Sequence, residues 1–472
     1  MRNFPFLGGD YQGRSPSFDA QRTVNLYPVL AENAGARSAV ALVGTPGLAA
    51  WASVGSGGIR GCIAFTATQA IVVSGTAVYS VTTAGVATLL AGAVLNTSGT
   101  VSLASNGSLV MMVTGGSDGY FINPATLTVT QITDPDFTGG TRVDFIDGYF
   151  VWSTPGTGQF RVTQLYGTGI DGLDFATAEG APDPLISCIV DHREVWLLGS
   201  TTTEVWYDAG GADFPLQRIQ GAFLEIGCGA AGSVAKLDNS IFWLASDERG
   251  FGTIQRAAGY TPTRVSNRAV EYAIASYATV SDAVAYTYVQ EGHSFYVISF
   301  PTAGASWCLD VSTGLWHERT YRNADGSHGR HRSNCQMNFA GKVIVGDWEN
   351  GNLYDLDLDT FTDNGTAIER IRACPHVVND GKYIFNSSLE VFMQTGVGLV
   401  SGEDPQARLR WSDDGGYEWS NEHWASFGKI GKRKTRVKWR RLGVTRDRVY
   451  EVAISDPVRV VLTGAQLVSA AA

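Results

Sequence analysis

Short apolar runs alternate with glycine-containing or polar turns along most of this chain, and the runs come in pairs. The first runs of the seven pairs are Gln69–Val73, Ser108–Val113, Tyr149–Ser153, Glu194–Leu198, Ser240–Leu244, Ser294–Ser299 and Lys342–Val345. The second runs are Ala77–Val81, Gly119–Asn123, Gln159–Thr163, Glu204–Tyr207, Thr253–Ala257, Ala305–Leu309 and Asn352–Asp355. Apolar runs of this length, bounded by turn residues, predict strands joined as hairpins.

The pairs recur at a nearly constant interval. Successive first runs begin 39, 41, 45, 46, 54 and 48 residues apart. This interval is typical of β-propellers, in which WD40-type blades span ~40–45 residues and kelch blades ~50. One hairpin cannot bury its apolar face in water, but a closed ring of hairpins can. The pattern therefore predicts an all-β fold with a β-propeller of about seven blades.

The repeat occupies only the middle of the chain. We expect residues 61–365 to form the propeller. Residues 1–60 are rich in turn signals and predict an extended N-terminal segment that lies along another part of the molecule. Residues 366–472 lose the interval and predict a small C-terminal β-sandwich-like module. Its strand-like runs are Leu389–Gln394, Arg408–Trp411, Arg436–Arg440 and Val458–Leu462.

Composition supports the predicted all-β fold and indicates reduced cysteines. Glycine accounts for 56 of 472 residues, or about 12% against a typical ~7%, as many tight turns require. Six scattered cysteines without a CxxC pair are interpreted as reduced core residues of a protein made in a cytosol. We expect no signal peptide, and no apolar run approaches the ~18 residues that would predict membrane insertion.

Three first runs of the repeat contain a tryptophan at their third or fourth position, Trp152, Trp196 and Trp243. Large aromatic side chains fill the space between twisted sheets, so we expect these three to pack between neighbouring blades. The alternative is that they stack on a ligand.

Neither a metal site nor a cofactor is predicted. His328, His331 and Cys335 lie close together in sequence, but a metal site needs a fourth ligand and the segment is interpreted as a polar loop.

The segment Ser412–Trp419 has the spacing Ser-x-Asp-x-Gly-x-x-Trp of an Asp-box, a motif familiar in sialidases. Its physics is local, because Ser and Asp side chains bond the backbone of a tight turn. We therefore expect Asp414 and Glu418 to shape a turn rather than to catalyse. Other catalytic signatures are missing, so the chain is predicted not to be an enzyme. A sialidase-like or glycan-binding propeller remains an alternative.

Charge is divided unevenly along the chain. From Glu369 to the end, 16 Lys and Arg face 12 Asp and Glu, a net of +4, whereas the rest holds 19 and 33, a net of −14. In a strand, Arg436, Lys438 and Arg440 would share one face, with Val437 and Trp439 on the other. The preceding cations are Lys429, Lys432, Arg433 and Lys434.

Such a basic face has three interpretations. It is a solvated or salt-bridged face, a contact for an acidic protein surface, or a contact for DNA phosphates. An acidic body with a basic tail does not look like a free nucleic-acid binder, whose whole domain is usually basic.

Three stretches carry a family resemblance. The opening Ser17–Pro28, with Gly44–Leu48 after it, resembles the start of tail nozzle proteins of short-tailed phages, also called packaged-DNA stabilisation proteins or tail accessory factors. The resemblance continues in Asp191–Tyr207 and in the closing Val437–Gly443. It therefore spans most of the chain.

The resemblance implies a β-propeller with added β modules, assembled as a homohexameric ring below the head–tail adaptor in the virion tail. Such a ring extends the DNA channel, retains the packaged genome and conducts it during ejection, without DNA sequence specificity. Its implied partners are portal-associated proteins, a plug or needle, and tailspikes or fibres, after synthesis in the host bacterial cytoplasm. Because the resemblance is clear in the lead segment, we expect Arg22, Asn25 and Tyr27 to belong to an ordered assembly segment. A generic protein-binding propeller is the remaining alternative.

Overall fold

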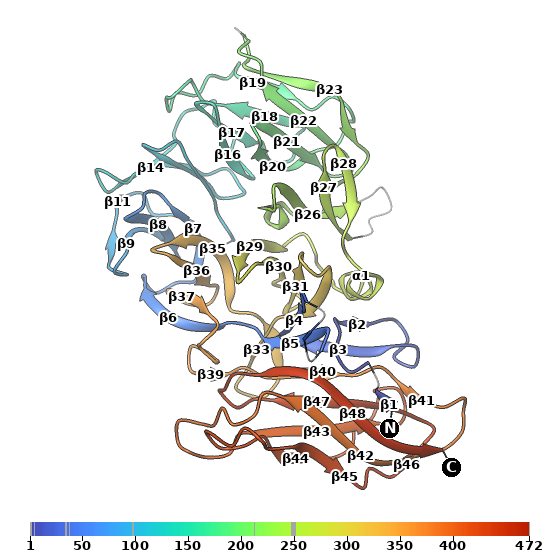
Figure 1. Ribbon diagram of the computed structural model, residues 1–472. Helices are drawn as coiled ribbons and strands as arrows, with labels where there is room; N and C mark the ends of the chain where they lie inside the picture. The colour runs from blue at the N-terminus through green and yellow to red at the C-terminus, as the bar shows by residue number, and fades with distance from the viewer. Residues whose placement is uncertain are drawn as a thin grey trace.

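The computed structural model describes residues 2–3, 5–33, 35–36, 38–96, 99–211, 213–246 and 252–471. These residues form a propeller and, below it in Figure 1, a β-sandwich built largely from the C-terminal part of the chain. Both chain ends lie beside the sandwich. The predicted fold class, an all-β propeller with a C-terminal sandwich, is confirmed.

Within the described residues the propeller has seven blades, and the innermost strand of each blade lines a central cavity. These innermost strands are β7 (Ile59–Ala64), β12 (Ser102–Ser105), β16 (Val143–Ile146), β20 (Leu185–Asp191), β25 (Ala235–Leu237), β29 (Val284–Gln290) and β35 (Ser333–Phe339). The short strand β24 (Gly227–Cys228) and β25 both pair with β26 (Ser240–Ser246), and η1 (Ala231–Ser233) lies between β24 and β25 in the chain.

The paired apolar runs of the sequence are the two middle strands of each blade. The first of them are β8 (Gln69–Ser74), β13 (Val110–Val113), β17 (Tyr149–Ser153), β21 (Glu194–Gly199), β26 (Ser240–Ser246), β30 (His293–Phe300) and β36 (Lys342–Asp347). Their partners are β9 (Ala77–Thr82), β14 (Gly119–Asn123), β18 (Gln159–Val162), β22 (Thr203–Asp208), β27 (Thr253–Ala258), β31 (Ala305–Asp310) and β37 (Asn352–Asp357). Each pair is an antiparallel hairpin, as predicted.

The fourth strands of the blades pair with the outer side of the hairpins. They are β10 (Ala87–Leu89), β15 (Thr128–Gln131), β19 (Phe175–Thr177), β23 (Leu216–Leu224), β28 (Thr261–Arg264), β32 (Leu315–Glu318) and, in the last blade, β6 (Gly47–Ser53). The additional elements are β11 (Ala91–Gly92), the helix α1 (Arg268–Ala275), the hairpin β33 (Thr320–Arg322) and β34 (His328–Arg330), and β38 (Thr362–Asp363) with β39 (Thr366–Ala367).

The ring closes through a strand from the N-terminal segment. Strand β6 pairs antiparallel with β37, from Ser53 opposite Asn352 to Gly47 opposite Asp357. The last blade therefore contains both an early and a late part of the chain. This pairing holds the first and seventh blades together without a covalent bond.

Apolar clusters fill the gaps between successive blades. Trp152 lies with Val113 and Met111 of the preceding blade, and Trp196 and Trp243 share one cluster between the fourth and fifth blades. All three indole side chains are at most 5% exposed. The prediction that these tryptophans pack between blades is confirmed.

The sandwich core lies between two sheets. One sheet contains β4 (Leu26–Leu30), β5 (Val40–Gly44), β48 (Val461–Ala471), β42 (Ile384–Met393) and β45 (Val437–Arg440), with β1 (Arg2–Asn3) and β46 (Val444–Thr445) at its margins. The other contains β3 (Ala20–Val24), β40 (Arg370–Ala373), β47 (Asp447–Ile454), β43 (Gln406–Ser412) and β44 (His423–Ser426), with β2 (Tyr11–Gln12) and β41 (Val377–Val378).

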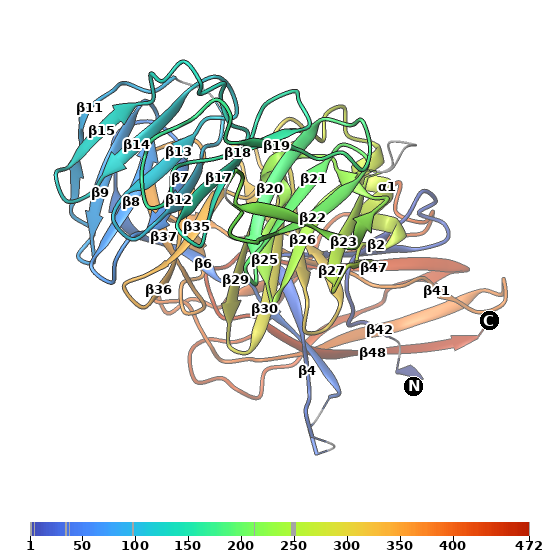
Figure 2. The ribbon, with the colours of Figure 1, turned by 90° about the horizontal axis from the view of Figure 1, so that it is seen from above.

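The propeller and the sandwich share a sheet. Strand β32 of the sixth blade pairs with β3, and β3 pairs with β40, so one 11-stranded sheet runs from the blade into the sandwich. In Figure 2 the propeller sheets lie over the long strands β42 and β48. Strands of the N-terminal segment thus belong to sheets of both the propeller and the sandwich.

Candidate functional site

The basic strand β45 turns one face into the sandwich core and the other face outward. Val437 and Trp439 are 1% and 5% exposed and belong to the sandwich core. Arg440 is exposed and Lys438 is half-buried, and the exposed Arg436 immediately precedes the strand. This is the alternation that the sequence predicts for a strand with one solvated face.

A buried carboxylate on the neighbouring strand pairs with two of these cations. Strand β42 places Glu390 opposite Lys438 in the antiparallel register. Arg436 binds Glu390 through two hydrogen bonds, one of 2.7 Å from Nε, and Lys438 Nζ lies 3.8 Å from the same carboxylate. Hydrogen bonding from Arg436, followed by its charge, lowers the pKa of Glu390. Part of the basic face is therefore neutralised within the subunit.

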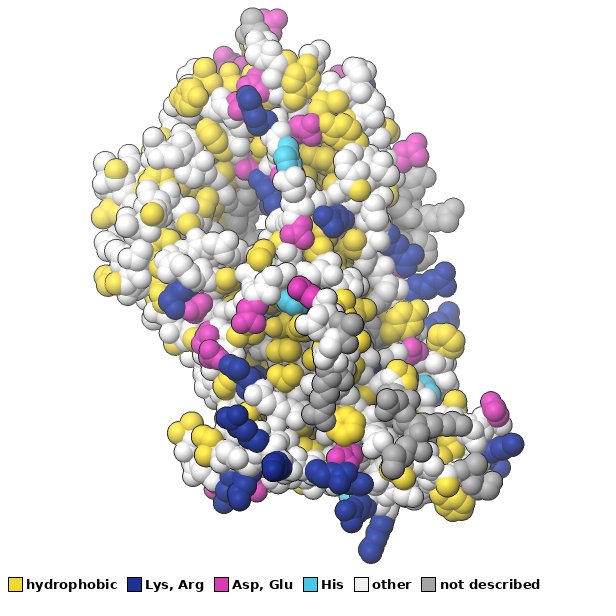
Figure 3. Space-filling model, viewed as in Figure 1, with side chains coloured by type: hydrophobic (Ala, Val, Ile, Leu, Met, Phe, Trp, Pro, Cys, Tyr) yellow, Lys and Arg dark blue, Asp and Glu magenta, His cyan; other side chains and the backbone are white. Residues whose placement is uncertain are grey.

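The loop before β45 and the last residue of the strand carry cations without such partners. Lys432, Arg433, Lys434 and Arg440 are exposed and form no ion pair with any described residue. Figure 3 shows Lys and Arg side chains gathered over this end of the sandwich. These four side chains make up what we call the basic loop surface.

The basic loop is held in place by an adjacent loop rather than hanging free. The Gly431 N–H donates to the Gly396 carbonyl at 3.0 Å, and Thr395 Oγ1 donates to the Arg433 carbonyl at 2.9 Å. Gly396 has φ +75°, and a Cβ there would lie 2.7 Å from the Arg433 nitrogen. Close backbone approach thus fixes the loop while its charged side chains point to solvent.

The three predicted residues of the lead segment are used inside the subunit. Arg22 forms a bidentate pair with Glu318, at 2.6 and 2.8 Å. Asn25 is buried with φ 52°, and its amide donates to the carbonyls of Thr320 and Glu369 while its oxygen accepts from the Thr320 N–H. These contacts pin the lead segment between the sixth blade and the sandwich.

Tyr27 completes the lead-segment contacts from the next strand. It is 3% exposed, and its ring meets the rings of His293 and Phe295 edge-on, at centroid distances of 5.3 Å. All three side chains therefore fix the subunit's own architecture, and their part in assembly stays a prediction.

A charged cluster lies at the same junction. Glu369 binds His328 at 3.0 Å and also pairs with Arg408. Burial alone would raise the pKa of Glu369, but hydrogen bonds from His328 and Arg408 and the charge of Arg408 lower it to about 2. The cluster joins the hairpin β33–β34 to the sandwich strand β43.

The interpretation of the segment around His328 as a polar loop is wrong. Strand β34 and the start of β35 occupy this segment, and His331 is fully buried between Arg319 and Ser333. His328 faces Glu369, and Cys335 faces Cys62. The three side chains thus have different partners, and the described part of the chain contains no group of three or more potential ligands that could hold a metal ion.

The Asp-box forms a turn in the sandwich between β43 and β44. Asp414 accepts hydrogen bonds from the N–H groups of Tyr417 and Glu418, at 3.0 Å each, and from the Ser412 hydroxyl at 2.6 Å. Trp419 Nε1 donates to the Gly416 carbonyl at 3.1 Å. The Asp414 carboxylate accepts hydrogen bonds from backbone N–H groups of the turn, as the sequence predicts.

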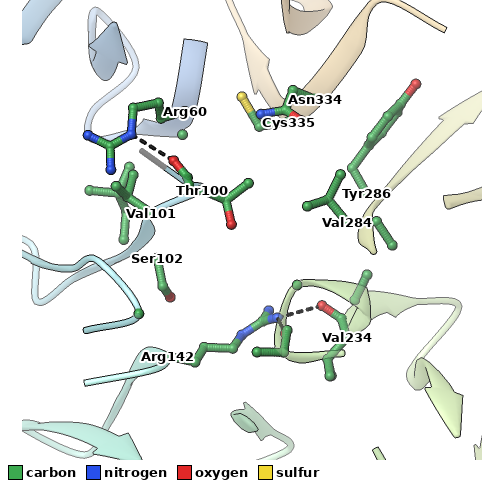
Figure 4. Close-up of a pocket in the computed structure, with 18 of the residues that line it drawn as sticks. Arg60, Thr100, Val101, Ser102, Arg142, Val234, Val284, Tyr286, Asn334 and Cys335 are labelled. Carbon is green, nitrogen blue, oxygen red and sulfur yellow. Dashed lines mark hydrogen bonds between the residues drawn. The ribbon is translucent and has the colours of Figure 1, made fainter. Parts of the chain in front are cut away.

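The central cavity of the propeller encloses 610 Å³ and is crossed by arginines bound to backbone carbonyls. Arg60 Nε donates to the Gly99 carbonyl at 2.7 Å, and Arg142 Nη1 donates to the Val234 carbonyl at 2.8 Å, as Figure 4 shows for the second bond. Arg142 thereby links the third and fifth blades.

Within the described residues no helix has the length and apolar character needed to cross a membrane.

Comparison with solved structures gives matches of very low sequence identity. A computationally designed protein called Ika8 is 14% identical, with 66% of this chain and 99% of that chain covered and a TM-score of 0.39. The WD40 propeller domain of Doa1 is 11% identical over 66% and 98%, with a TM-score of 0.41. A chain of the mitotic checkpoint complex is 10% identical over 70% and 99%, with a TM-score of 0.41. At these TM-scores the likenesses add nothing to the assignment.

Comparison with curated proteins gives no match. Two family models match almost the whole chain. The model described as bacteriophage P22 Gp10, beta-propeller, matches residues 2–361, and the model described as bacteriophage P22 Gp10, beta-sandwich, matches residues 369–469. The chain therefore belongs to the family of bacteriophage P22 Gp10, the packaged-DNA stabilisation proteins that serve as tail nozzle proteins of short-tailed phages.

Proposed function

We propose that this protein is a ring-forming subunit of the phage tail that extends the DNA channel below the head–tail adaptor. In this role it retains the packaged genome and conducts it during ejection, as a homohexamer that also contacts a plug or needle and tailspikes or fibres. The observation that carries the proposal is the match of both family models, over residues 2–361 and 369–469. It is a structural role that requires no chemistry from the subunit.

For this role we propose three parts of the chain. Residues 61–365 form the propeller, residues 366–472 form the sandwich, and the lead segment at residues 1–60 contributes strands to both. Support comes from β6, which completes the last blade, and from β3, which joins the sixth blade to the sandwich.

The basic loop surface is the proposed contact for an acidic surface of the adaptor or of another tail subunit. Its four cations form no ion pair with any described residue, whereas Arg436 and Lys438 share Glu390. Exposed apolar side chains accompany the cations, since Ile430 is 72% exposed and Val400 on the adjacent loop is fully exposed. Apolar groups beside unpaired cations favour a protein partner over DNA phosphates.

The experiment is a salt-dependent assembly assay with the triple variant Lys432→Ser, Arg433→Ser, Lys434→Ser. We expect it to assemble with tail components more slowly than wild type at low salt. The difference should shrink at 1 M salt, where the screening length falls to ~3 Å. The matched control, Arg193→Ser, Arg268→Ser, Lys342→Ser, removes three exposed propeller cations and should assemble at the wild-type rate.

Two outcomes contradict this contact. Equal assembly rates for the triple variant and wild type at low salt would mean that the basic loop surface is only solvated. Normal assembly with altered genome retention or ejection would mean that the surface faces DNA rather than a protein.

A further inference from the structure

Two thiols face each other at the seam where the propeller ring closes. Cys62 lies on β7 of the first blade and Cys335 on β35 of the seventh, 273 residues later. Their sulfur atoms are 3.4 Å apart, and both residues are partly exposed. Both line the central cavity, where Figure 4 shows the Cys335 sulfur beside Asn334.

The backbone around the two thiols is fixed from both blades. Asn334 Nδ2 donates to the Ile59 carbonyl at 3.0 Å, which joins the start of β35 to the start of β7. Opposite Cys335 on the neighbouring strand lies Gly346, where a Cβ would come 3.0 Å from the Cys335 sulfur. The absence of a side chain at Gly346 leaves room for the thiol, so the two sulfur atoms are held close without a bond between them.

The other four cysteines lack this arrangement. Cys188, Cys228, Cys308 and Cys374 are buried as free thiols, and the hydrogen bonds of Cys188, Cys228 and Cys374 go to backbone atoms or to a serine. The seam pair is thus distinguished by both proximity and access to the cavity.

We propose that Cys62 and Cys335 are an oxidation site whose disulfide covalently joins the first blade to the seventh. Forming it requires the sulfur separation to fall from 3.4 Å to about 2.05 Å, a combined shift of roughly 1.4 Å that small side-chain rotations supply. The disulfide would join the first and seventh blades at their inner strands. The β6–β37 pairing closes the ring at the outer side of the seventh blade.

The oxidant in this step is a low-molecular-weight disulfide such as oxidised glutathione. One cysteine, as its thiolate, attacks a sulfur of the reagent and expels one glutathione thiolate, which takes up the proton that the cysteine lost. The second cysteine then attacks the protein sulfur of the mixed disulfide and expels the second glutathione in the same way. Two protein thiols are oxidised to one disulfide, and one reagent disulfide is reduced to two thiols.

Local chemistry keeps the pair reduced while the surroundings are reducing. The hydrogen bond between the two thiols, together with burial, raises the pKa of Cys62 well above its usual value. Because the thiolate is the attacking species, oxidation at neutral pH is slow. Cytosolic thiol pools hold such pairs reduced, whereas an extracellular medium does not.

The test compares full-length protein held in dithiothreitol with protein incubated in oxidised glutathione under native conditions. Free thiols are alkylated after unfolding, and digested peptides are identified by mass spectrometry. We expect a Cys62–Cys335 cross-linked peptide with the loss of two hydrogens, and alkylation at the four buried cysteines. The unfolding midpoint of the oxidised protein should rise by about 5 °C, in line with the usual effect of a disulfide in a large domain.

Two single variants keep the test decisive. Cys62→Ala and Cys335→Ala each leave one seam thiol, so neither should gain the cross-link or the rise in midpoint, and either variant suffices if the other fails to fold. Alkylation of both seam cysteines in oxidised wild type would overturn the proposal. So would a stable glutathione adduct on either one, or an equal midpoint rise in a single variant.

Discussion

The buried carboxyl group of Asp10 predicts an unusual dependence of stability on pH. Asp10 is 2% exposed and accepts a hydrogen bond from the Thr23 N–H at 2.9 Å on Oδ2, whereas Oδ1 has no hydrogen-bond partner among the described residues. Burial, together with the negative charge of Glu318, raises the pKa of Asp10 from 3.8 to about 8. Between these two pKa values, we therefore expect the folded protein to keep a proton that the unfolded chain has lost.

The sign and size of the effect follow from linkage. Between the unfolded pKa and the folded pKa, the folded state binds more protons, so the free energy of unfolding decreases as the pH rises. One pKa unit corresponds to ~1.4 kcal/mol, so from pH 5 to pH 8 this group removes about 4 kcal/mol of stability. Asp10→Asn keeps an acceptor for Thr23 and cannot ionise, so it should lack this loss.

The assay is guanidinium unfolding followed by tryptophan fluorescence at pH 5, 6, 7 and 8. We expect the stability of Asp10→Asn relative to wild type to increase by about 4 kcal/mol across this range. The control Asp213→Asn changes an exposed aspartate in the propeller and should run parallel to wild type. A constant difference between Asp10→Asn and wild type, within about 1 kcal/mol, would mean that Asp10 is ionised in the folded protein.

Three further substitutions test the fold. Trp152→Ala empties part of the cluster between the second and third blades and should lower the free energy of unfolding by about 3–5 kcal/mol; a loss below about 1 kcal/mol would mean that the indole does not fill that gap. Asn25→Ala loses the amide hydrogen bonds and also strains the backbone at φ 52°. Asn25→Gly loses the same hydrogen bonds without that strain, so it should be the more stable of the two variants. Equal stability of the two variants would show that the positive φ carries no cost. Asp414→Ala should lower the thermal midpoint of the sandwich through the lost turn bonds, and a hydrolase activity that disappears in this variant would contradict the structural role of the Asp-box.

The first middle strands of the blades were predictable because most of their residues are buried, on both faces of the sheet. Their apolar runs, such as Tyr149–Ser153, are bounded by turn residues, and a local pattern of this kind needs no knowledge of distant partners. Outer strands such as β10 and β19 are only three residues long and contain no buried residue, so they carry no comparable signal. The C-terminal strand predicted at Val458–Leu462 begins instead at Val461, after the turn around Asp456 and Pro457.

What escaped prediction depends on pairings between distant segments. Strand β6 closes the last blade across about 300 residues, and its own sequence looks like part of a turn-rich lead segment. Glu390 is 46 residues from Arg436, so its role became visible only when the register of β42 and β45 was known. The same holds for Cys62 and Cys335, whose juxtaposition follows from ring closure.

The central claim is that the protein is a ring-forming subunit of the tail. Electron cryomicroscopy of the virion tail, with the subunit fitted as a propeller and sandwich, tests this most directly. We expect six copies in a closed ring around the DNA channel below the adaptor, with the basic loop surface against an acidic neighbour. Copies scattered as monomers on the outside of the tail, with no ring around the channel, would contradict it.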